Sequence, residues 1–506
     1  MNNKFDELAK GLAQSATRRQ ALKRFGVALA GMALAGFVAW PACAQFSQIG
    51  PLAELSQPNP IGGCNDGVTL PGTWTINDAV EPFVAVNPAH PNNVVAAWVL
   101  GPVQNIIAGV SVNGGQTWQQ VPIPLTICSG GPYLAAATER VAFAPNGDLY
   151  IIAVAANDLS IPGVFVCKSI DGGFQWSAPV GMTGNTFAPD GTPSITPDPG
   201  DPRFVYAVWD GADNGNRGTS VFSRTTDGGT TWEPARQLVQ LPAQNSIQFS
   251  QILALPNGTL VDVYEQYFSN LPKKPITQTS LQVTRSTDRG LTWSPPSLAV
   301  TMTPLYVTSG SSIGNTLVLD PETGQLLIDP TNPSFAIDRS SGNLYAVWED
   351  GRFSSFQYND IAFSMSSDGG LTWSAPIRVN QTPLSIPPLN RQAFLPAIGV
   401  AGNGLIGVSY YDFRFNDPAP GLPTDRWLVQ CQPAPGAPAS NPANWGNEVR
   451  LTDRSFNLEA SIIWGGGLML GEYFGLASSG NSFVAVFTQP DPNNGISSIF
   501  ARRVGP

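Results

Sequence analysis

One octapeptide recurs five times along this chain, and no other feature of the sequence constrains its fold as strongly. Each copy begins with Ser or Thr, carries Asp or Asn at its third position and Gly at its fifth, and ends in Trp. The copies span Ser111–Trp118, Ser169–Trp176, Thr225–Trp232, Ser286–Trp293 and Ser366–Trp373, and their starts lie 58, 56, 61 and 80 residues apart. A repeat of roughly 50 residues with strand-like segments between the copies predicts the blades of a β-propeller.

Four short strands fit into each repeat unit. In the fifth unit, alternating, β-branched and aromatic stretches occupy 333–338, 343–348, 360–366 and 376–379. The same frame fits the other units, and two further units without an intact octapeptide begin near Phe394 and Tyr473. The sequence therefore predicts an all-β propeller of four-stranded antiparallel blades. We expect seven blades, with six as the alternative if the last unit merges with an N-terminal piece.

The third residue of the octapeptide has an evident role in its turn. A carboxylate there can accept hydrogen bonds from the backbone N–H groups of the turn, and Gly permits the positive φ that a tight turn needs. The aspartates are Asp171, Asp227, Asp288 and Asp368. Because they recur in successive units, we interpret them as architectural rather than catalytic.

Residues 1–44 have the three parts of an export signal. Arg18 and Arg19 precede an apolar run from Val27 to Trp40, and the small residues of Ala42-Cys43-Ala44 follow. The paired arginines resemble the twin-arginine class, which predicts contact with the twin-arginine translocase and a periplasmic or secreted protein. We divide the rest into an N-terminal segment, 45–80, whose Leu52–Leu55 region is a candidate ring-closing strand, and the propeller, 81–506.

Charge and composition exclude several partners. The chain carries 36 acidic against 26 basic residues, a net charge of −10. The signal contributes +4, so the remainder is near −14, which disfavours nucleic acid and an anionic membrane surface. No metal or cofactor motif is present, and the single histidine, His90, lies in a predicted turn. Cys64 and Cys128 could form a disulfide. Cys167 and Cys431 are as consistent with buried free thiols inside strands as with a disulfide.

Blade geometry places the candidate chemistry on one face. In a four-stranded blade the octapeptide turn lies on one face, and the loops between strands B and C and between successive blades lie on the other. Acids, arginines and tyrosines gather in those opposite loops, as expected for a polar, sugar-like ligand. The candidate catalytic residues are Glu265, Asp350, Asp412 and Tyr473, and the candidate binding residues are Glu81, Arg217, Arg352, Arg391 and Arg414. Asp78, Glu139 and Glu472 lie in the same set of loops. The alternative is that Asp350–Arg352 and Asp412–Arg414 are repeated loop salt bridges.

The octapeptide matches the Asp box, Ser/Thr-x-Asp-x-Gly-x-Thr-Trp, and the chain resembles the sialidase-like, or BNR-repeat, superfamily over 81–506. That resemblance implies a tyrosine nucleophile helped by a glutamate, an aspartate acid/base and three arginines that clamp a carboxylate. By placement, Tyr473 and Glu265 match the nucleophile pair. The first clamp arginine of the family has no counterpart, because no Lys or Arg occurs between Gln45 and Glu139. The sequence thus favours a carbohydrate-active enzyme that is not an ordinary sialidase. The alternatives are a non-catalytic glycan- or protein-binding propeller and an envelope assembly factor.

Overall fold

The computed structural model describes residues 48–64, 73–101, 105–157, 162–182, 188–189, 191–212, 218–239, 241, 245–269, 276–306, 317–327, 332–464 and 467–506. The predicted signal, 1–44, lies outside the described residues. Those residues form strands and five short 3-10 helices, η1 (Ile127–Ser129), η2 (Gly351–Ser354), η3 (Pro388–Arg391), η4 (Pro442–Asn444) and η5 (Leu458–Ala460). Within these ranges no helix is long and apolar enough to cross a bilayer.

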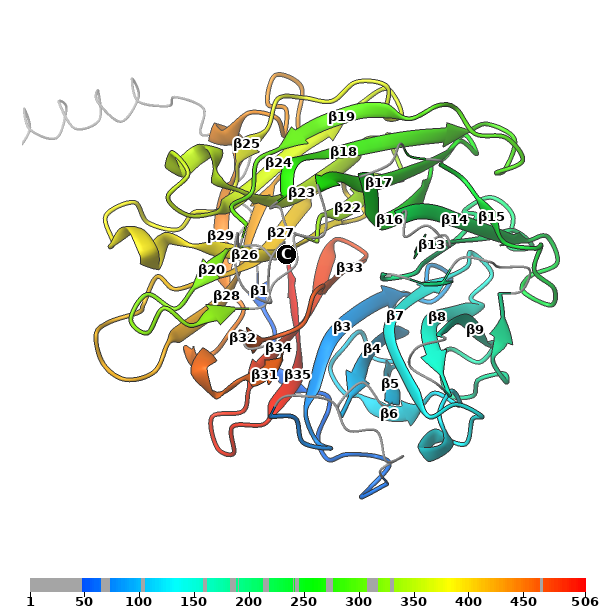
Figure 1. The fold of residues 1–506 in the computed structure, drawn as a ribbon, viewed down its shortest axis with the longest axis horizontal. Helices are drawn as coiled ribbons and strands as arrows, with labels where there is room; N and C mark the ends of the chain where they lie inside the picture. The colour runs from blue at the N-terminus through cyan, green and yellow to red at the C-terminus, as the bar shows by residue number, and fades with distance from the viewer. Residues whose placement is uncertain are drawn as a thin grey trace, which may run out of the picture. The chain divides into compact units, whose positions relative to one another are not determined.

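Seven antiparallel sheets follow one another around a ring, as the colour order in Figure 1 shows. Blade 1 contains β3 (Ala79–Val86), β4 (Val94–Leu100), β5 (Asn105–Ser111) and β6 (Gln119–Pro122). Blade 2 contains β7 (Ala135–Phe143), β8 (Leu149–Ala156), β9 (Gly163–Ser169) and β10 (Val180–Gly181). Blade 3 contains β12 (Ser194–Pro197), β13 (Val205–Ala212), β14 (Gly218–Thr225) and β15 (Arg236–Gln237), with β11 (Ala188–Pro189) paired to the end of β13.

The later blades repeat this arrangement. Blade 4 contains β16 (Asn245–Ala254), β17 (Leu260–Ser269), β18 (Ile276–Ser286) and β19 (Ser297–Met302). Blade 5 contains β22 (Ser334–Ile337), β23 (Leu344–Asp350), β24 (Asp360–Ser366) and β25 (Ile377–Arg378). Blade 6 contains β26 (Ala393–Val400), β27 (Ile406–Asp412), β28 (Pro423–Cys431) and β29 (Gly446–Arg450), with β30 (Phe456–Asn457) also paired to β28. The prediction of an all-β propeller with four-stranded blades is confirmed, and seven sheets act as blades.

Blade 7 is built from both ends of the propeller sequence. Its chain-terminal strands are β33 (Gly475–Ser479), β34 (Ser482–Pro490) and β35 (Ser497–Gly505). The outer position is filled by β1 (Gln48–Ile49) and β2 (Ala53–Glu54), which both pair antiparallel with β35. The inner strand β3 of blade 1 then packs against β33. Pairing of the N-terminal segment with the last blade therefore closes the ring.

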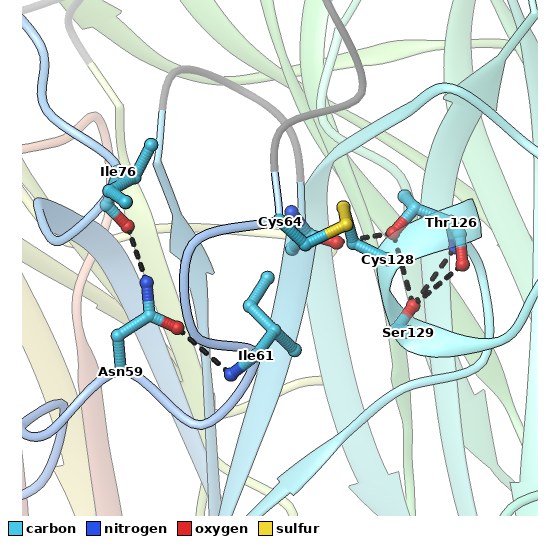
Figure 2. Close-up of a disulfide and its surroundings, with 8 residues drawn as sticks. Asn59, Ile61, Cys64, Ile76, Thr126, Cys128 and Ser129 are labelled. Carbon is cyan, nitrogen blue, oxygen red and sulfur yellow. Dashed lines mark hydrogen bonds between the residues drawn. A yellow bond between two sulfur atoms is a disulfide. The ribbon is translucent and has the colours of Figure 1, made fainter.

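A disulfide joins the N-terminal segment to blade 1. Cys64 and Cys128 are bonded with a Cα–Cα distance of 5.7 Å, and Cys128 lies in η1 directly after the first blade (Figure 2). On the Cys64 side, the Asn59 amide donates to the carbonyl of Ile76 at 2.8 Å. These bonds hold the segment that leads from the ring-closing strands into β3. Cys167 and Cys431 are buried in strands.

The Asp-box turns use their polar groups internally. In blade 5, Asp368 Oδ1 accepts hydrogen bonds from the backbone N–H groups of Leu371 and Thr372 at 3.0 and 2.9 Å. Hydrogen bonds from threonine and from the turn lower the pKa of Asp227 and Asp288, the equivalent aspartates of blades 3 and 4, to about 2. The turns are thus stabilised by ionised aspartates.

The same turns also contact the preceding blade. Gly290 has a φ of 82°, and a Cβ at this position would lie 2.6 Å from the ring of Phe222 in blade 3. Only glycine fits both the conformation and the contact. In the next turn back, the carbonyl of Gly228 accepts from Tyr150 of blade 2 at 2.9 Å. The Asp-box face therefore connects each blade to its neighbour.

Four inner strands, β3, β7, β16 and β26, carry a β-bulge in their N-terminal halves. Each bulge places one non-glycine residue at positive φ, namely Glu81, Thr138, Phe249 and Leu395. Carboxylates of the preceding blades hold two of them. Asp210 accepts from the N–H groups of Phe249 and Ser250 at 2.6 and 3.3 Å, and Glu349 accepts from that of Leu395 at 2.8 Å. These acids therefore have architectural roles.

An eighth, smaller sheet comes from two inter-blade connections. It contains β20 (Val318–Leu319) and β21 (Leu326–Leu327), which form a hairpin, and β31 (Ile462–Trp464) with β32 (Gly467–Met469). β21 pairs in parallel with β32. Ile462 and Met469 pack with Val80 and Val99 of blade 1. The sheet therefore lies at the start of β3, on the face opposite the Asp boxes, which we call the loop-bearing face.

Candidate functional site

Two glycines bring the chain between blades 6 and 7 against the start of β3. A Cβ on Gly471 would lie 2.7 Å from the backbone nitrogen of Glu81, and a Cβ on Gly475 would lie 2.6 Å from that of Val84. Contacts this close exclude any larger side chain at either position. The segment between them carries Glu472 and Tyr473, so backbone packing places both beside Glu81.

Tyr473 faces a carboxylate from blade 2. Its hydroxyl donates to Glu139 Oε2 at 3.4 Å, and both residues are buried, with 4% and 0% of their surface exposed. Arg140 follows Glu139 in β7, and its guanidinium lies 4.2 Å from the centre of the Tyr473 ring and 4.4 Å from that of Phe83. The phenol is thus held between an acceptor and a cation.

Three carboxyl groups in this cluster are hard to ionise. Burial, reinforced by the charge of Glu472, raises the pKa of Glu81 to about 8, although Tyr473 and Arg140 oppose the shift. Burial also raises the pKa of Glu472 to about 7. Burial and the charge of Glu81 raise the pKa of Glu139 well above its usual range. Carboxyl groups with such values can hold a proton at neutral pH and deliver it to a substrate.

The cluster borders the central channel. A cavity of about 200 Å³ is lined by Tyr473, Arg140 and Gln251 together with apolar residues of the inner strands. Tyr473 and Arg140 are therefore the members of the cluster that a ligand in the channel reaches first, while the carboxyl groups lie behind them. Among the described residues, no group of three His, Cys, Asp or Glu side chains is arranged to hold a metal ion.

Glu265 belongs to a separate buried cluster in blades 3 and 4. Its Oε1 accepts from the hydroxyl of Tyr306 at 3.2 Å, and burial, with the nearby charge of Asp210, raises its pKa to about 8. The structure therefore pairs Tyr473 with Glu139, where the sequence analysis expected Glu265. The sequence placed Tyr473 and Glu265 in loops of one face but could not tell which blades face each other across the channel mouth.

Asp350 and Asp412 are enclosed by their own loops. Asp350 accepts hydrogen bonds from Trp348, from Thr303 and from the guanidinium of Arg352, which lies 2.8 Å away. These bonds outweigh burial and lower its pKa. Asp412 accepts from Thr382 at 2.6 Å and forms an ion pair of 2.7 Å with Arg414. Both fit the alternative of repeated loop salt bridges, which leaves no acceptor free for catalysis.

The expected binding arginines are likewise engaged within the protein. Arg352 is bound to Asp350 as described. Arg414 also pairs with Glu448 at 2.6 Å and stacks on Trp427, and its side chain is 8% exposed. Arg391 donates to the carbonyl of Ile386 at 2.7 Å. Arg217 lies outside the described residues. Of the predicted binding residues, Glu81 alone is seen to join Tyr473.

Sequence reasoning did not assign a role to Glu139, Arg140 or Glu472. Glu139 and Glu472 were noted in the connecting loops, but nothing in their spacing joins residues 139 and 473. One signal was present: the glycines of Gly471–Gly475 flank Glu472 and Tyr473, and paired glycines around functional side chains often mark close backbone approach.

No protein-family model and no curated protein matches this chain. Several solved structures are similar to it. The GH93 α-L-arabinofuranosidase of Fusarium graminearum in complex with arabinobiose has a TM-score of 0.45 and 12% identity, with 90% of this chain and 98% of that chain covered. The Hadza microbial sialidase Hz136 has a TM-score of 0.44, 13% identity and coverages of 83% and 75%. A protein of unknown function from Dyadobacter fermentans DSM 18053 has a TM-score of 0.43, 11% identity and coverages of 91% and 99%. Likenesses this remote carry no argument about what this chain does.

Proposed function

We propose that this protein is a carbohydrate-active enzyme that hydrolyses glycosidic bonds at the Tyr473 cluster. The observation that carries the proposal is the hydrogen bond from the Tyr473 phenol to Glu139 beside Glu81, whose pKa is raised to about 8. Burial raises the pKa of Tyr473 well above its usual range, so the phenol needs a neighbouring base to take its proton as it attacks. A carboxyl group that stays protonated at neutral pH is a general acid.

The proposed reaction has two steps. The reacting form is the fraction of molecules in which Glu139 is ionised, a minor one at neutral pH because burial raises its pKa. In that form the Tyr473 oxygen attacks the anomeric carbon while Glu139 accepts the phenolic proton, and protonated Glu81 donates its proton to the departing glycosidic oxygen. This breaks the glycosidic bond and forms a covalent glycosyl–tyrosine intermediate, an aryl glycoside. Water then attacks the same carbon, gives one proton to Glu81 and displaces the tyrosine, which regains its proton from Glu139. Arg140 lies over the ring and stabilises the negative charge that develops on the phenolic oxygen.

Activity is tested with the full-length protein on a panel of fluorogenic glycosides and plant and bacterial polysaccharides. We expect Tyr473→Phe to abolish turnover and Glu139→Gln to lower kcat by roughly 100- to 10,000-fold, because each removes a group that acts in the transition state. Tyr133→Phe is the matched control, since this tyrosine stacks on Phe165 in blade 2 away from the cluster. Turnover that survives Tyr473→Phe but is lost in Glu265→Gln would transfer the site to blade 4.

We also propose export by the twin-arginine route, which rests on the sequence of residues 1–44. Replacing Arg18 and Arg19 by lysine should leave full-length precursor in the cytoplasm, because the arginine pair is the address that the translocase reads. Cell fractionation with immunoblotting measures this. An unchanged amount of processed protein outside the cytoplasm would reject the assignment.

A further inference from the structure

The propeller encloses a larger cavity below the Tyr473 cluster. Its volume is about 630 Å³, and it is lined by the inner strands β3, β7, β12, β16, β22 and β33 and by turns that follow inner strands. Those turns, between the first and second strand of a blade, lie on the same face as the Asp boxes. The cavity is therefore the lower part of the central channel, toward the Asp-box face.

Two arginines line this cavity and the smaller one above it. Arg140 projects from β7, and Arg339 comes from the turn between β22 and β23. The structure gives neither guanidinium a hydrogen bond or an ion pair to any described residue. Arg140 contacts the rings of Phe83 and Tyr473, and the carboxyl groups of Glu139 and Glu81 lie near enough to act on its charge. Gln251 and Ser478 also line both cavities and are donors available to the same space.

Most of the sixteen described arginines have a polar partner, and Arg236, Arg391, Arg426 and Arg503 donate hydrogen bonds without an ion pair. Eight other arginines form ion pairs in the described structure, namely Arg203, Arg224, Arg289, Arg352, Arg378, Arg414, Arg450 and Arg502. Acidic residues exceed basic ones by 36 to 26, so partners are plentiful. Yet no Asp or Glu is among the described residues that line either cavity. The channel wall is thus positively charged within an acidic molecule.

Enclosure makes these charges costly. Burial lowers the pKa of both Arg140 and Arg339. Arg339 is nevertheless an exposed residue, so solvent in the channel reaches its guanidinium while protein surrounds it at a greater distance. A guanidinium in this setting gains more from an anion than one on the open surface, since the surrounding protein weakens solvent screening.

We propose that the central channel binds a small oxyanion, a carboxylate, sulfate or phosphate group, between Arg140 and Arg339. The planar guanidinium fork matches such groups and binds them in a bidentate manner. The Gln251 amide and the Ser478 hydroxyl supply further donors from blades 4 and 7. In the smaller cavity these residues lie beside Tyr473, so the proposed anion site adjoins the proposed nucleophile, and Arg140 contributes to both.

The test uses the full-length protein and the variants Arg339→Gln and Arg203→Gln. Arg203 is the matched control because it also carries one positive charge but is 70% exposed and paired with Asp201. Thermal shift and isothermal titration with sulfate, phosphate, acetate and glucuronate, each against sodium chloride of equal ionic strength, separate inorganic from organic oxyanions. We expect saturable binding of at least one probe, weakened about tenfold or more by Arg339→Gln and unchanged in Arg203→Gln.

Two results would overturn the proposal. One is the absence of saturable binding for every probe beyond the sodium chloride control. The other is binding that Arg339→Gln leaves intact, which would move the anion elsewhere. Arg339 makes no described contact, so its variant should unfold at the same temperature as the parent when no probe is present, and Arg339→Lys, which keeps the charge, should retain part of the binding. The binding measurement does not depend on glycosidase activity, so a loss of activity in Tyr473→Phe says nothing against anion binding.

Discussion

The carboxyl groups of the Asp-box turns and the buried glutamates near the channel mouth have pKa values shifted in opposite directions. On the Asp-box face, hydrogen bonds from the turn lower the pKa of Asp227 and Asp288 to about 2. Near the channel mouth on the other face, burial raises the pKa of Glu81 and Glu265 to about 8. The box turns are built from acids that are stable as anions, whereas these two buried glutamates are stable with a proton; Asp350, on their face, is kept ionised by its pairing with Arg352.

The direction of the pKa shift distinguishes structural carboxyl groups from candidate catalytic ones better than the face on which they lie. The box aspartates recur with the same bonds, and so do the pairs Asp350–Arg352 and Asp412–Arg414 on the opposite face. Tyrosine–glutamate contacts also occur at Tyr306–Glu265 and Tyr410–Glu448, but the Tyr473–Glu139 pair lies beside a further buried carboxyl group, Glu81, and Tyr473 lines the channel cavity. A group that repeats in each blade maintains the blade, whereas a group that resists ionisation and reaches a cavity is the better candidate for catalysis.

The largest effect is expected from Gly475→Ala. The new Cβ would lie 2.6 Å from the backbone nitrogen of Val84, which cannot move without shifting β3 and Glu81. We expect a loss of about 3 kcal/mol in unfolding free energy together with loss of turnover. Gly446→Ala is the control, because nothing lies within 4 Å of its added Cβ. Equal behaviour of the two variants in denaturant titrations would show that close packing does not assemble the cluster.

The pH dependence of the unfolding free energy should show both the raised and the lowered pKa values in one curve. Burial raises the folded-state pKa of Glu265 to about 8 and of Asp210 and Asp262 to about 7, above their values in the unfolded chain. Between about pH 4 and 8 the unfolded chain releases protons that the folded chain keeps, so stability falls as pH rises, by about 1.4 kcal/mol per pH unit for each proton. Below about pH 4 the box aspartates, with folded pKa values near 2, reverse the slope.

Chemical denaturation from pH 3 to 9 measures this curve. Glu265→Gln should reduce the slope above pH 4 by about one proton, since the amide has nothing to release. The exposed Glu322 provides the control, and Glu322→Gln should leave the slope unchanged. A maximum near neutral pH in the parent protein would contradict the raised values on the loop-bearing face.

The sequence predicts the fold better than the site for a physical reason. Blade strands and Asp-box turns are local patterns, so the octapeptides and the alternation between them were sufficient for an all-β propeller. The site depends on contacts between residues 334 apart in the chain, as for Tyr473 and Glu139. Those contacts depend on the bulge at Glu81 and on the approach of Gly471, neither of which follows from a strand pattern.

A smaller effect is expected from Asp368→Ala on the Asp-box face. It removes the acceptor of the Leu371 and Thr372 N–H groups and should cost about 1–2 kcal/mol in blade 5, while turnover stays intact where the protein is folded. Asp368→Asn should cost less, because Asn113 serves the same turn in blade 1 and accepts from Thr117 at 2.9 Å. Thermal unfolding measures both. An unmoved melting temperature with lost activity would place chemistry on this face.

The last prediction is that no sialic acid is released from a fluorogenic α-sialoside. Holding that carboxylate beside the cleaved bond requires a cluster of arginines. Of the arginines expected to serve, Arg352 and Arg414 are paired with Asp350 and Asp412, and Arg391 is bound to a carbonyl. Arg140 is the cation placed at Tyr473, a single arginine rather than a cluster. Release of sialic acid that Tyr473→Phe abolishes would show that this one arginine suffices, and the contrast between the two faces would then have to include recognition of an anionic sugar.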